Sequence, residues 1–560
     1  METKPWLDHY DAGVPHTLRP YPDRTLLEVI ADTARQRPDH PVALFKGASL
    51  SYGQLERLTD AFAAGLAALG VKKGDRVALV MPNIPQLLIA EFGAWKAGAI
   101  AAIINPLYTE DELDEAFREC GAQTAVVLTR FYGKVKAVQS KTSLRCVLAT
   151  NIKEYLPPLL RVLFTLAKEK KEGDRIMLQP GDQWLADLLR QYASAPRPKV
   201  AVGPQDPAIM LFTGGTTGTP KAAIGSHGAL LMSGMQFAAW FHASIAEWED
   251  IFTLNLPLFH VYAQAGVMPC ALVSHGIAAM IPNPRDLDDV IATIEKVRPA
   301  WLPGVPTLYI ALLNHPRVVA GKADLRSIKL CISGAAPLLA ETKQRFEALT
   351  GGHICEGYAL TESMMAACVS PVQGTYKVGS VGMPLPDVEV RIADAETGEG
   401  SLPAGEIGEI LLRAPQLMLG YWQRPTETAN AIRDGWLYTG DLGYLDEDGY
   451  LFIVDRKKDL IKVSGFQVWP REIEEVIATH PAVAEVGVAG VPDPQQGEAV
   501  MAWVVLRPGQ QVTVDELRAY CRERLTGYKV PKRIEFRDSL PKTLVGKVLR
   551  RALAAEQKGK

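Results

Sequence analysis

The sequence predicts an α/β protein: a large amino-terminal domain of layered α/β sheets, a small β subdomain, and a small α+β domain at the carboxyl end. Three observations predict this organisation. Strand-like and helix-like segments alternate over residues 25–120, and the same rhythm returns over 205–370. Glycines, prolines and short strands dominate 381–450. A tail of about 100 residues, a typical domain size, follows with its own alternating pattern.

The amino-terminal segments are typical of a mainly parallel sheet. A helix begins at residue 25, and a short buried strand covers 76–81. A helical stretch over 85–97 lies between this strand and the next one, 100–105, and a further strand covers 124–128. Parallel strands need such crossover helices, so the alternation indicates parallel pairing.

The predicted domain boundary lies in the charged run 455–459, directly after a predicted strand at 451–454. Residues 1–455 then form the amino-terminal domain, with the β subdomain at about 381–455. Residues 459–560 form the carboxyl-terminal domain.

Composition and charge exclude several classes of protein. The chain has 560 residues and a net charge of −3, which argues against a general nucleic-acid binder. Its seven cysteines show no Cys-x-x-Cys spacing, so we expect reduced, mostly buried thiols of a cytoplasmic protein and no zinc site. The amino terminus has no apolar signal core.

The longest uncharged stretch, 251–284, raises the question of a transmembrane helix. Polar residues and prolines interrupt it at Asn255, Pro257, His260, Gln264, Pro269 and His275. That density suits strands, loops and pocket walls of a large core better than a helix facing lipid. We therefore predict a buried apolar layer beside a site.

A second apolar segment, 155–171, has a stripe at helical spacing. The stripe consists of Leu156, Leu159, Leu160, Leu163 and Ala167. The favoured interpretation is a helix docked on its own domain. The alternative is a basic amphipathic helix that lies on an anionic membrane surface.

Residues 213–221 (TGGTTGTPK) predict a phosphate-binding loop. Its glycines let the backbone approach a polyphosphate, its threonines can donate hydrogen bonds, and Lys221 adds a positive charge. An apolar strand, 208–212, precedes it, as is usual where α/β proteins hold nucleotides. The loop is not a Walker A motif, because Pro220 precedes the lysine and Ala222 follows it.

This loop resembles the signature loop of the adenylate-forming enzymes, which include acyl-CoA synthetases, luciferases and peptide-synthetase adenylation domains. Further segments resemble that family's motifs in the right order: 256–260 (LPLFH), 333–337 (SGAAP), 356–362 (EGYALTE), 438–441 (YTGD), 455–459 (DRKKD) and 541–547 (PKTLVGK). The likeness is greatest to the bacterial long-chain fatty acid–CoA ligases, and it includes 104–109, 283–286, 420–425 and 526–532.

The resemblance implies a two-step reaction with ATP, Mg²⁺ and coenzyme A. A carboxylate oxygen of a long-chain fatty acid attacks the α-phosphorus of ATP and expels pyrophosphate. The thiol of coenzyme A then attacks the acyl-adenylate, and AMP leaves. Such chemistry depends on positioning and on electrostatic stabilisation. The resemblance is also compatible with a homodimer and with peripheral contact at the inner face of the cell membrane.

The resemblance assigns the nucleotide site residue by residue. Glu362 would ligate Mg²⁺, with Thr213 beside it, because a hard cation needs oxygen ligands near the phosphates. Tyr358 would stack on adenine, and Asp441 and Arg456 would bind the ribose. The full set of residues implied to bind ATP or AMP is Thr213, Gly214, Gly215, Thr216, Thr217, Gly218, Lys221, Gly334, Ala335, Glu356, Gly357, Tyr358, Thr361, Asp441 and Arg456.

The catalytic residues implied are Lys547, His260 and Thr361. Lys547 would bridge the attacking carboxylate and the α-phosphate, so a mobile carboxyl-terminal domain must close over the site. His260 would orient the carboxylate; it need not act as a base, because a fatty acid is already ionised at neutral pH. Residues 456–458 would form the hinge, centred on Lys458, and Gly465 would meet the pantetheine of coenzyme A.

Two alternatives remain open at this stage. The first is an adenylate-forming ligase for another acid or acceptor, such as an aryl acid or an acyl-carrier protein. The second is a non-catalytic lipid-uptake relative that keeps the fold. Lys221, Glu362, Asp441 and Lys547 are all present, which argues against the second. The expected walls of an acyl tunnel are 251–284 and a helix around 230–241.

Overall fold

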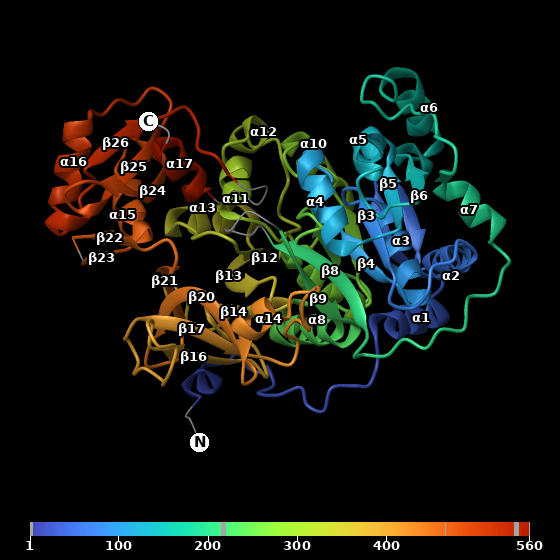
Figure 1. Ribbon diagram of the computed structural model, residues 1–560, viewed down its shortest axis with the longest axis horizontal. Coiled ribbons are helices and arrows are strands. Elements are labelled where there is room, and N and C mark those ends of the chain that lie inside the picture. The colour runs from blue at the N-terminus through green and yellow to red at the C-terminus, as the bar shows by residue number, and fades with distance from the viewer. Residues whose placement is uncertain (1–3, 214–219, 465, 543–547, 559–560) are drawn as a thin grey trace.

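The computed structural model describes residues 4–213, 220–464, 466–542 and 548–558, and Figure 1 shows their arrangement. A large body contains four sheets, and a smaller unit with a fifth sheet lies at one end of the molecule. This architecture confirms the predicted fold class.

The largest sheet has eight strands in the order β18-β9-β8-β4-β3-β5-β6-β7. The six strands from β8 to β7 are parallel, as predicted, and β9 and β18 add an antiparallel edge. The bounds are β3 Arg76–Val80, β4 Ile100–Ile103, β5 Thr124–Leu128, β6 Cys146–Thr150, β7 Gln183–Trp184, β8 Pro207–Thr213, β9 Lys221–Ser226 and β18 Gly420–Tyr421.

Crossover helices connect these strands. All twelve residues of α3 (Pro85–Lys96) are buried, because this helix is apolar nearly all round and packs between the sheet and α2 (Tyr52–Ala68). Capping boxes fix the start of several helices; Ser51 caps α2, and Thr109 caps α4 (Glu110–Cys120). The other helices of this layer are α1 Leu26–Gln36, α5 Thr129–Gln139, α7 Leu185–Gln191 and α8 His227–Trp240.

Two further sheets form the central part of the body. One has the order β10-β11-β1-β2, and the other has the order β12-β13-β14-β15. Bridges from Trp301 to Phe252 and to Leu330 connect the two sheets. The strands are β1 Pro41–Phe45, β2 Ala48–Ser51, β10 Ile251–Leu254, β11 Ile277–Met280, β12 Leu330–Ser333, β13 His353–Leu360, β14 Met365–Val369 and β15 Met383–Pro384; the helices are α9 Met268–Val273, α10 Leu287–Val297, α11 Pro306–Leu313, α12 Pro316–Val319 and α13 Ala340–Thr350.

The region predicted as a β subdomain contains a five-stranded antiparallel sheet. Its strands are β16 Glu389–Ala393, β17 Gly408–Arg413, β19 Ile432–Arg433, β20 Trp436–Leu445 and β21 Leu451–Arg456, and one short helix, α14 (Pro425–Ala431), accompanies them. Strand β21 runs two residues beyond its predicted end at 454, because Asp455 and Arg456 still pair with Leu442 and Asp441 of β20.

The carboxyl-terminal unit has its own sheet and its own apolar clusters around Val488 and Trp503. Its elements are β22 Ile461–Val463, β23 Phe466–Val468, α15 Pro470–Ala478, β24 Val483–Asp493, β25 Gly497–Leu506, α16 Val514–Arg522, β26 Arg533–Phe536 and α17 Arg550–Lys558. A charge cluster fastens it to the body. Arg550 donates to Asp455 at 2.6 Å, and the backbone N–H of Arg471 donates to the other oxygen of the same carboxylate at 2.7 Å.

The uncharged stretch 251–284 folds into strand β10, a π-helix (Tyr262–Val267), α9 and strand β11. It is thus a buried layer of strands, loops and short helices, as predicted. Within the described residues, no helix combines the length and the apolarity that crossing a membrane requires. Six of the seven cysteines are buried, also as predicted.

The favoured interpretation of residues 155–171 is wrong. Helix α6 (Pro158–Ala167) forms within this segment, yet none of its ten residues is buried. Figure 1 shows it projecting at the edge of the molecule beyond α5 and α7. Of the predicted stripe, Leu156 packs against the core just before the helix, but the residues on α6 itself do not: Leu159 is 72% exposed, and Leu163 is 51% exposed.

Candidate functional site

The two ends of the predicted phosphate loop lie side by side. Thr213 closes β8, Lys221 opens β9, and the two residues pair across this antiparallel connection. The Thr213 hydroxyl donates to the Lys221 carbonyl at 3.3 Å. Both therefore sit at the carboxyl end of β8, where open α/β sheets place their ligands. The loop residues Gly214, Gly215, Thr216, Thr217 and Gly218 lie outside the described residues.

An acidic group and a tyrosine complete this end of the site. The Tyr421 hydroxyl donates to Glu362 Oε1 at 2.7 Å, and Lys221 Nζ lies 5.2 Å from the centroid of the Tyr421 ring. Burial and the adjacent carboxylate raise the pKa of Tyr421, so its phenol stays protonated and donates. The same tyrosine thus contacts Glu362 through its hydroxyl and Lys221 through its ring.

The donor set fits Mg²⁺ bound together with phosphates. The described residues contain no group of three or more His, Cys, Asp or Glu side chains that could hold a metal ion on their own. Mg²⁺ is usually held by one or two carboxylates plus substrate phosphate oxygens and waters. Glu362 supplies one such carboxylate beside the phosphate loop, and the Thr213 hydroxyl could supply a further oxygen.

The predicted adenine and ribose residues also lie together. The Tyr358 hydroxyl of β13 donates to Asp441 Oδ2 at 2.6 Å, and Arg456 Nε lies 3.1 Å from Asp441 Oδ1. Asp441 is only 5% exposed, so its charge depends on these partners. A carboxylate offers about four lone-pair sites, which leaves capacity for ribose hydroxyls beside these two bonds.

The segment after β12 contributes a tight backbone to the same site. Ala335 has a φ of +68°, a left-handed conformation that is uncommon for a residue with a side chain. A Cβ added at Gly334 would lie 3.5 Å from the Gly357 carbonyl, so the two predicted glycines are close neighbours. Among the residues that the structure describes, the buried Ser333 hydroxyl beside them finds no hydrogen-bond partner. An orphaned polar group of this kind is expected where a ligand binds.

Glu356 and Thr361, both predicted to contact the nucleotide, make hydrogen bonds within the protein. Glu356 accepts from the Tyr376 hydroxyl at 2.7 Å and from the Leu338 N–H at 3.4 Å. Its carboxylate therefore contacts the end of the 334–338 segment. Thr361 begins the turn after β13, and its carbonyl accepts from the Met364 N–H.

His260 lies just before the π-helix, at the edge of the apolar layer. Its Nδ1 accepts from the Tyr262 N–H at 3.3 Å, so the ring's only proton is on Nε2. Burial lowers the pKa of His260 to about 4. The imidazole is therefore neutral at pH 7 and presents Nε2–H as a donor, which suits the orientation of a carboxylate and not its deprotonation.

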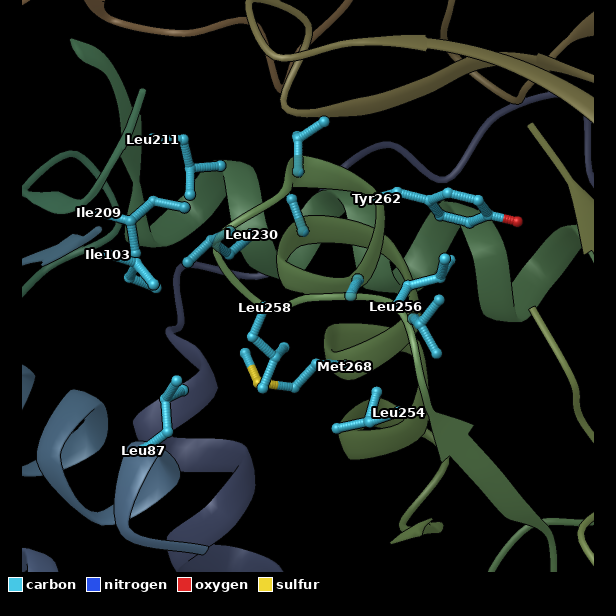
Figure 2. Close-up of a cluster of buried hydrophobic side chains, with 14 of the residues drawn as sticks. Leu87, Ile103, Ile209, Leu211, Leu230, Leu254, Leu256, Leu258, Tyr262 and Met268 are labelled. Carbon is cyan, nitrogen blue, oxygen red and sulfur yellow. The ribbon is translucent and has the colours of Figure 1, made fainter. Parts of the chain in front are cut away.

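Figure 2 shows part of the buried apolar layer formed by the segment that contains His260. Leu254, Leu256 and Leu258 lie beside Tyr262 and Met268, and Leu230 of α8 faces them from the other side. Asn83 fixes the loop that carries these leucines: its amide donates to the Leu254 and Leu256 carbonyls, and its carbonyl accepts from the Leu258 N–H. The segments predicted to wall an acyl tunnel are thus adjacent.

The π-helix also contacts a buried acid on α3. The Gln264 amide donates to Glu91 Oε1, and Glu91 is fully buried on α3. Desolvation raises the pKa of Glu91 to about 8, so this carboxyl is protonated at neutral pH.

The substitution Glu91→Gln is expected to remove a pH dependence of stability. The folded protein keeps the Glu91 proton up to about pH 8, whereas the unfolded chain loses it near pH 4.5, so stability falls as pH rises between these values. Thermal unfolding from pH 5 to 8 should show the variant gaining about 3–4 kcal/mol relative to wild type. Parallel stability curves for the two proteins would contradict this.

The remaining predicted residues belong to the second domain. Lys458 lies between β21 and β22, at the junction of the two domains. Gly465 and Lys547 lie outside the described residues, although the segments on either side of residues 543–547 are fixed: Lys542 contacts Glu485 at 2.6 Å, and the Leu549 N–H donates to the Pro541 carbonyl.

The family models match two parts of the chain. The model described as "AMP-binding enzyme" matches residues 30–422, and the one described as "AMP-binding enzyme C-terminal domain" matches 472–547. The chain belongs to the AMP-binding enzyme family. This AMP-binding enzyme is 41% identical over 559 residues to a protein of Bacillus subtilis named long-chain-fatty-acid–CoA ligase, covering 99% of this chain and 98% of the relative.

Solved structures resemble this AMP-binding enzyme over nearly its whole length. ATP-bound MatB from Rhodopseudomonas palustris, 30% identical, superposes with a TM-score of 0.82 and covers 96% of this chain and 99% of its own. The apo form of the same protein has the same identity and coverage but a TM-score of 0.72. The arrangement of this chain is therefore nearer to the ATP-bound form.

Several functional residues were not predicted from the sequence. Tyr421 belongs to a motif that resembles the family (420–425), but nothing indicated its contact with Glu362. Asn83 and the contact between Glu91 and Gln264 were not predicted. Polar residues inside apolar runs, as at Glu91 and Gln264, were the one available signal, because a buried polar group needs a specific reason to be there.

Proposed function

We propose that this protein is an ATP-dependent long-chain fatty acid–CoA ligase that forms AMP. One observation supports it above all: β13 and the turn after it connect two clusters suited to the two ends of ATP. Tyr358 belongs to the group with Asp441 and Arg456, and Glu362, four residues later, belongs to the group with Tyr421 and Lys221. The 41% identity to a named long-chain-fatty-acid–CoA ligase supports the choice of acid.

In the first half-reaction the fatty acid carboxylate attacks the α-phosphorus, and pyrophosphate leaves. The Asp441 group would bind the ribose hydroxyls and hold the nucleoside, and Lys221 with the loop threonines would neutralise the departing phosphates. Glu362 and Thr213 would hold Mg²⁺, which disperses phosphate charge when bound. The neutral His260 would donate from Nε2–H to one carboxylate oxygen and so aim the other at phosphorus.

The second domain would serve both half-reactions. We propose that Lys547 reaches the α-phosphate in one orientation, and that the hinge at 456–458 then lets the domain present Gly465 to coenzyme A. The thiol attacks the acyl carbon, and AMP leaves with the electron pair of the broken C–O bond. The Asp455–Arg550 contact is well placed to hold the first orientation, because it joins the body directly to α17.

The proposal is tested by a series of fatty acids of increasing length, assayed for pyrophosphate release with and without coenzyme A. We expect release to depend on the acid and AMP release to depend on the thiol. If an aryl acid is preferred, or if an acyl-carrier protein replaces coenzyme A, the alternative ligase hypothesis is correct. If no acid releases pyrophosphate, the protein is not a ligase of this kind.

Replacing His260 by alanine is expected to lower kcat/KM for the fatty acid by about ten- to a hundredfold, the worth of a hydrogen bond to a charged group. Glutamine at this position keeps an N–H donor and should lose less. Because the pKa of His260 is about 4, the wild-type rate should show no inflection from this residue between pH 6 and 8. An inflection near pH 6.5 that disappears in His260→Ala would show that the ring titrates as an acid or base.

We further propose that the protein works in the cytoplasm, in keeping with its buried free thiols, and that it contacts the inner face of the cell membrane. Self-association as a homodimer stays a prediction, and sedimentation of the full-length protein would test it.

A further inference from the structure

Helix α6 is amphipathic, but its apolar side faces away from the protein and its polar side faces toward it. Its polar side is turned toward the protein: the Arg161 guanidinium donates to the carbonyls of Lys153 and Glu154, and the Thr165 carbonyl accepts from Arg175. Its apolar side is turned to the outside: Leu159, Leu160, Val162, Leu163 and Leu166 are between 42% and 79% exposed. A helix on the surface of a globular protein normally has the opposite orientation.

Basic side chains border this apolar face. Lys168, Lys170, Lys171 and Arg175 follow the helix and are exposed. Two acidic residues of the same stretch are turned inward: Glu169 is 5% exposed and contacts Lys153, while Asp174 is 1% exposed and binds Arg130 and the Thr129 hydroxyl. The third, Glu172, has a side chain that is 34% exposed, and it pairs with Arg130. The exposed part of residues 158–175 therefore has mainly apolar and positive groups, and each of its three carboxylates is paired with a basic side chain.

A cavity lies beside the start of α6, on the side of the helix that carries Arg161. This cavity has a volume of about 570 Å³, and it is lined by Pro157 and Pro158 together with Leu50, Leu58, Ala61 and Leu189. An aliphatic chain could occupy it, since its walls are largely apolar.

We propose that α6 is a membrane-docking surface that lies in the interface of an anionic phospholipid bilayer. The leucine face would enter the boundary between headgroups and acyl chains by about 5–10 Å, and the lysines would contact anionic headgroups. The carboxylates near the helix are already paired within the protein, so the exposed lysines give this surface a net positive charge. That charge, beside the leucine face, favours an anionic bilayer over a protein partner. The inference does not depend on the proposed reaction.

Flotation of the full-length protein with lipid vesicles tests the proposal. The wild type should float with vesicles that contain phosphatidylglycerol and much less with pure phosphatidylcholine, and salt should weaken the binding. The triple variant Leu159→Glu, Leu163→Glu, Leu166→Glu should bind at least about tenfold more weakly. Because these side chains are exposed, its thermal stability should equal that of wild type.

A matched control uses exposed apolar residues far from α6 in the fold. Val319, Val378 and Ile407 are 72%, 68% and 45% exposed, and glutamate at these positions should leave flotation unchanged. Replacing Lys168, Lys170 and Lys171 by glutamine should weaken binding to anionic vesicles by about tenfold and abolish most of its salt dependence.

Several outcomes would overturn the proposal. One is a wild-type protein that does not float with anionic vesicles, and another is a leucine variant that floats as well as wild type. A third is a dimer in sedimentation that the leucine substitutions dissociate, because the surface would then bind a second copy of the chain. Activity with fatty acid in detergent should be equal in all variants. A failure of the membrane proposal can therefore be distinguished from a failure of the proposed reaction.

Discussion

Replacing Lys547 by alanine is expected to abolish acyl-adenylate formation and to leave thioester formation from preformed acyl-adenylate near the wild-type rate. The lysine would stabilise negative charge that develops only while carboxylate and α-phosphate react. Removing such a group typically costs about a hundred- to a thousandfold in rate. Pyrophosphate release measures the first half-reaction, and acyl-CoA formed from synthetic acyl-adenylate measures the second.

Lys542→Ala is the matched control for this experiment. It removes a lysine five positions earlier in the same segment, one whose ammonium is bound to Glu485 at 2.6 Å and which would take no part in the chemistry. We expect both half-reactions of this variant to stay near wild type. Equal losses of both half-reactions in Lys547→Ala would contradict the account in which one domain adopts two orientations.

Asp441→Asn is expected to lower kcat/KM for ATP by about a hundredfold or more. The carboxylate pairs with Arg456 and accepts from Tyr358, and it would also accept from the ribose. Asparagine has one acceptor oxygen in place of two and no charge, so it would leave the Arg456 guanidinium without its counter-ion. Initial rates at varied ATP concentration measure the effect.

Tyr358→Phe separates the contribution of the ring from that of the hydroxyl. It keeps the aromatic face that would stack on adenine and removes only the hydrogen bond to Asp441. We expect kcat/KM for ATP to fall by about tenfold or less, roughly the value of one hydrogen bond to a charged group.

The contradicting outcome concerns Asp441→Asn. If this variant bound ATP as wild type does while remaining folded, the ribose assignment would be wrong.

The strands of the large sheet could be predicted because each is a short apolar run between helical segments. Residues 124–128, for instance, form β5 with the predicted bounds. The end of β21 could not be predicted, because Asp455 and Arg456 read as solvated charges in the sequence. Their place in the ladder depends on pairing with Asp441 and Leu442, and such pairing overrides local preference.

The candidate site was only partly predictable for a related reason. Motif resemblance named Glu362, but its contact with Tyr421 joins residues 59 positions apart and requires β18 to pair with β9.

The orientation of helix α6 could not be predicted from the sequence either. A leucine stripe reveals that a helix has an apolar face, but it does not reveal whether that face turns toward the core or away from it. Here the inward hydrogen bonds of Arg161 decide the orientation.

The most direct test of the central claim is ATP–pyrophosphate exchange in the absence of coenzyme A, measured with and without a long-chain fatty acid. If the clusters around Tyr358 and Glu362 hold ATP for attack at its α-phosphorus, labelled pyrophosphate should enter ATP only when the acid is present. Cleavage to ADP and phosphate, or an absence of exchange with every acid offered, would contradict the account.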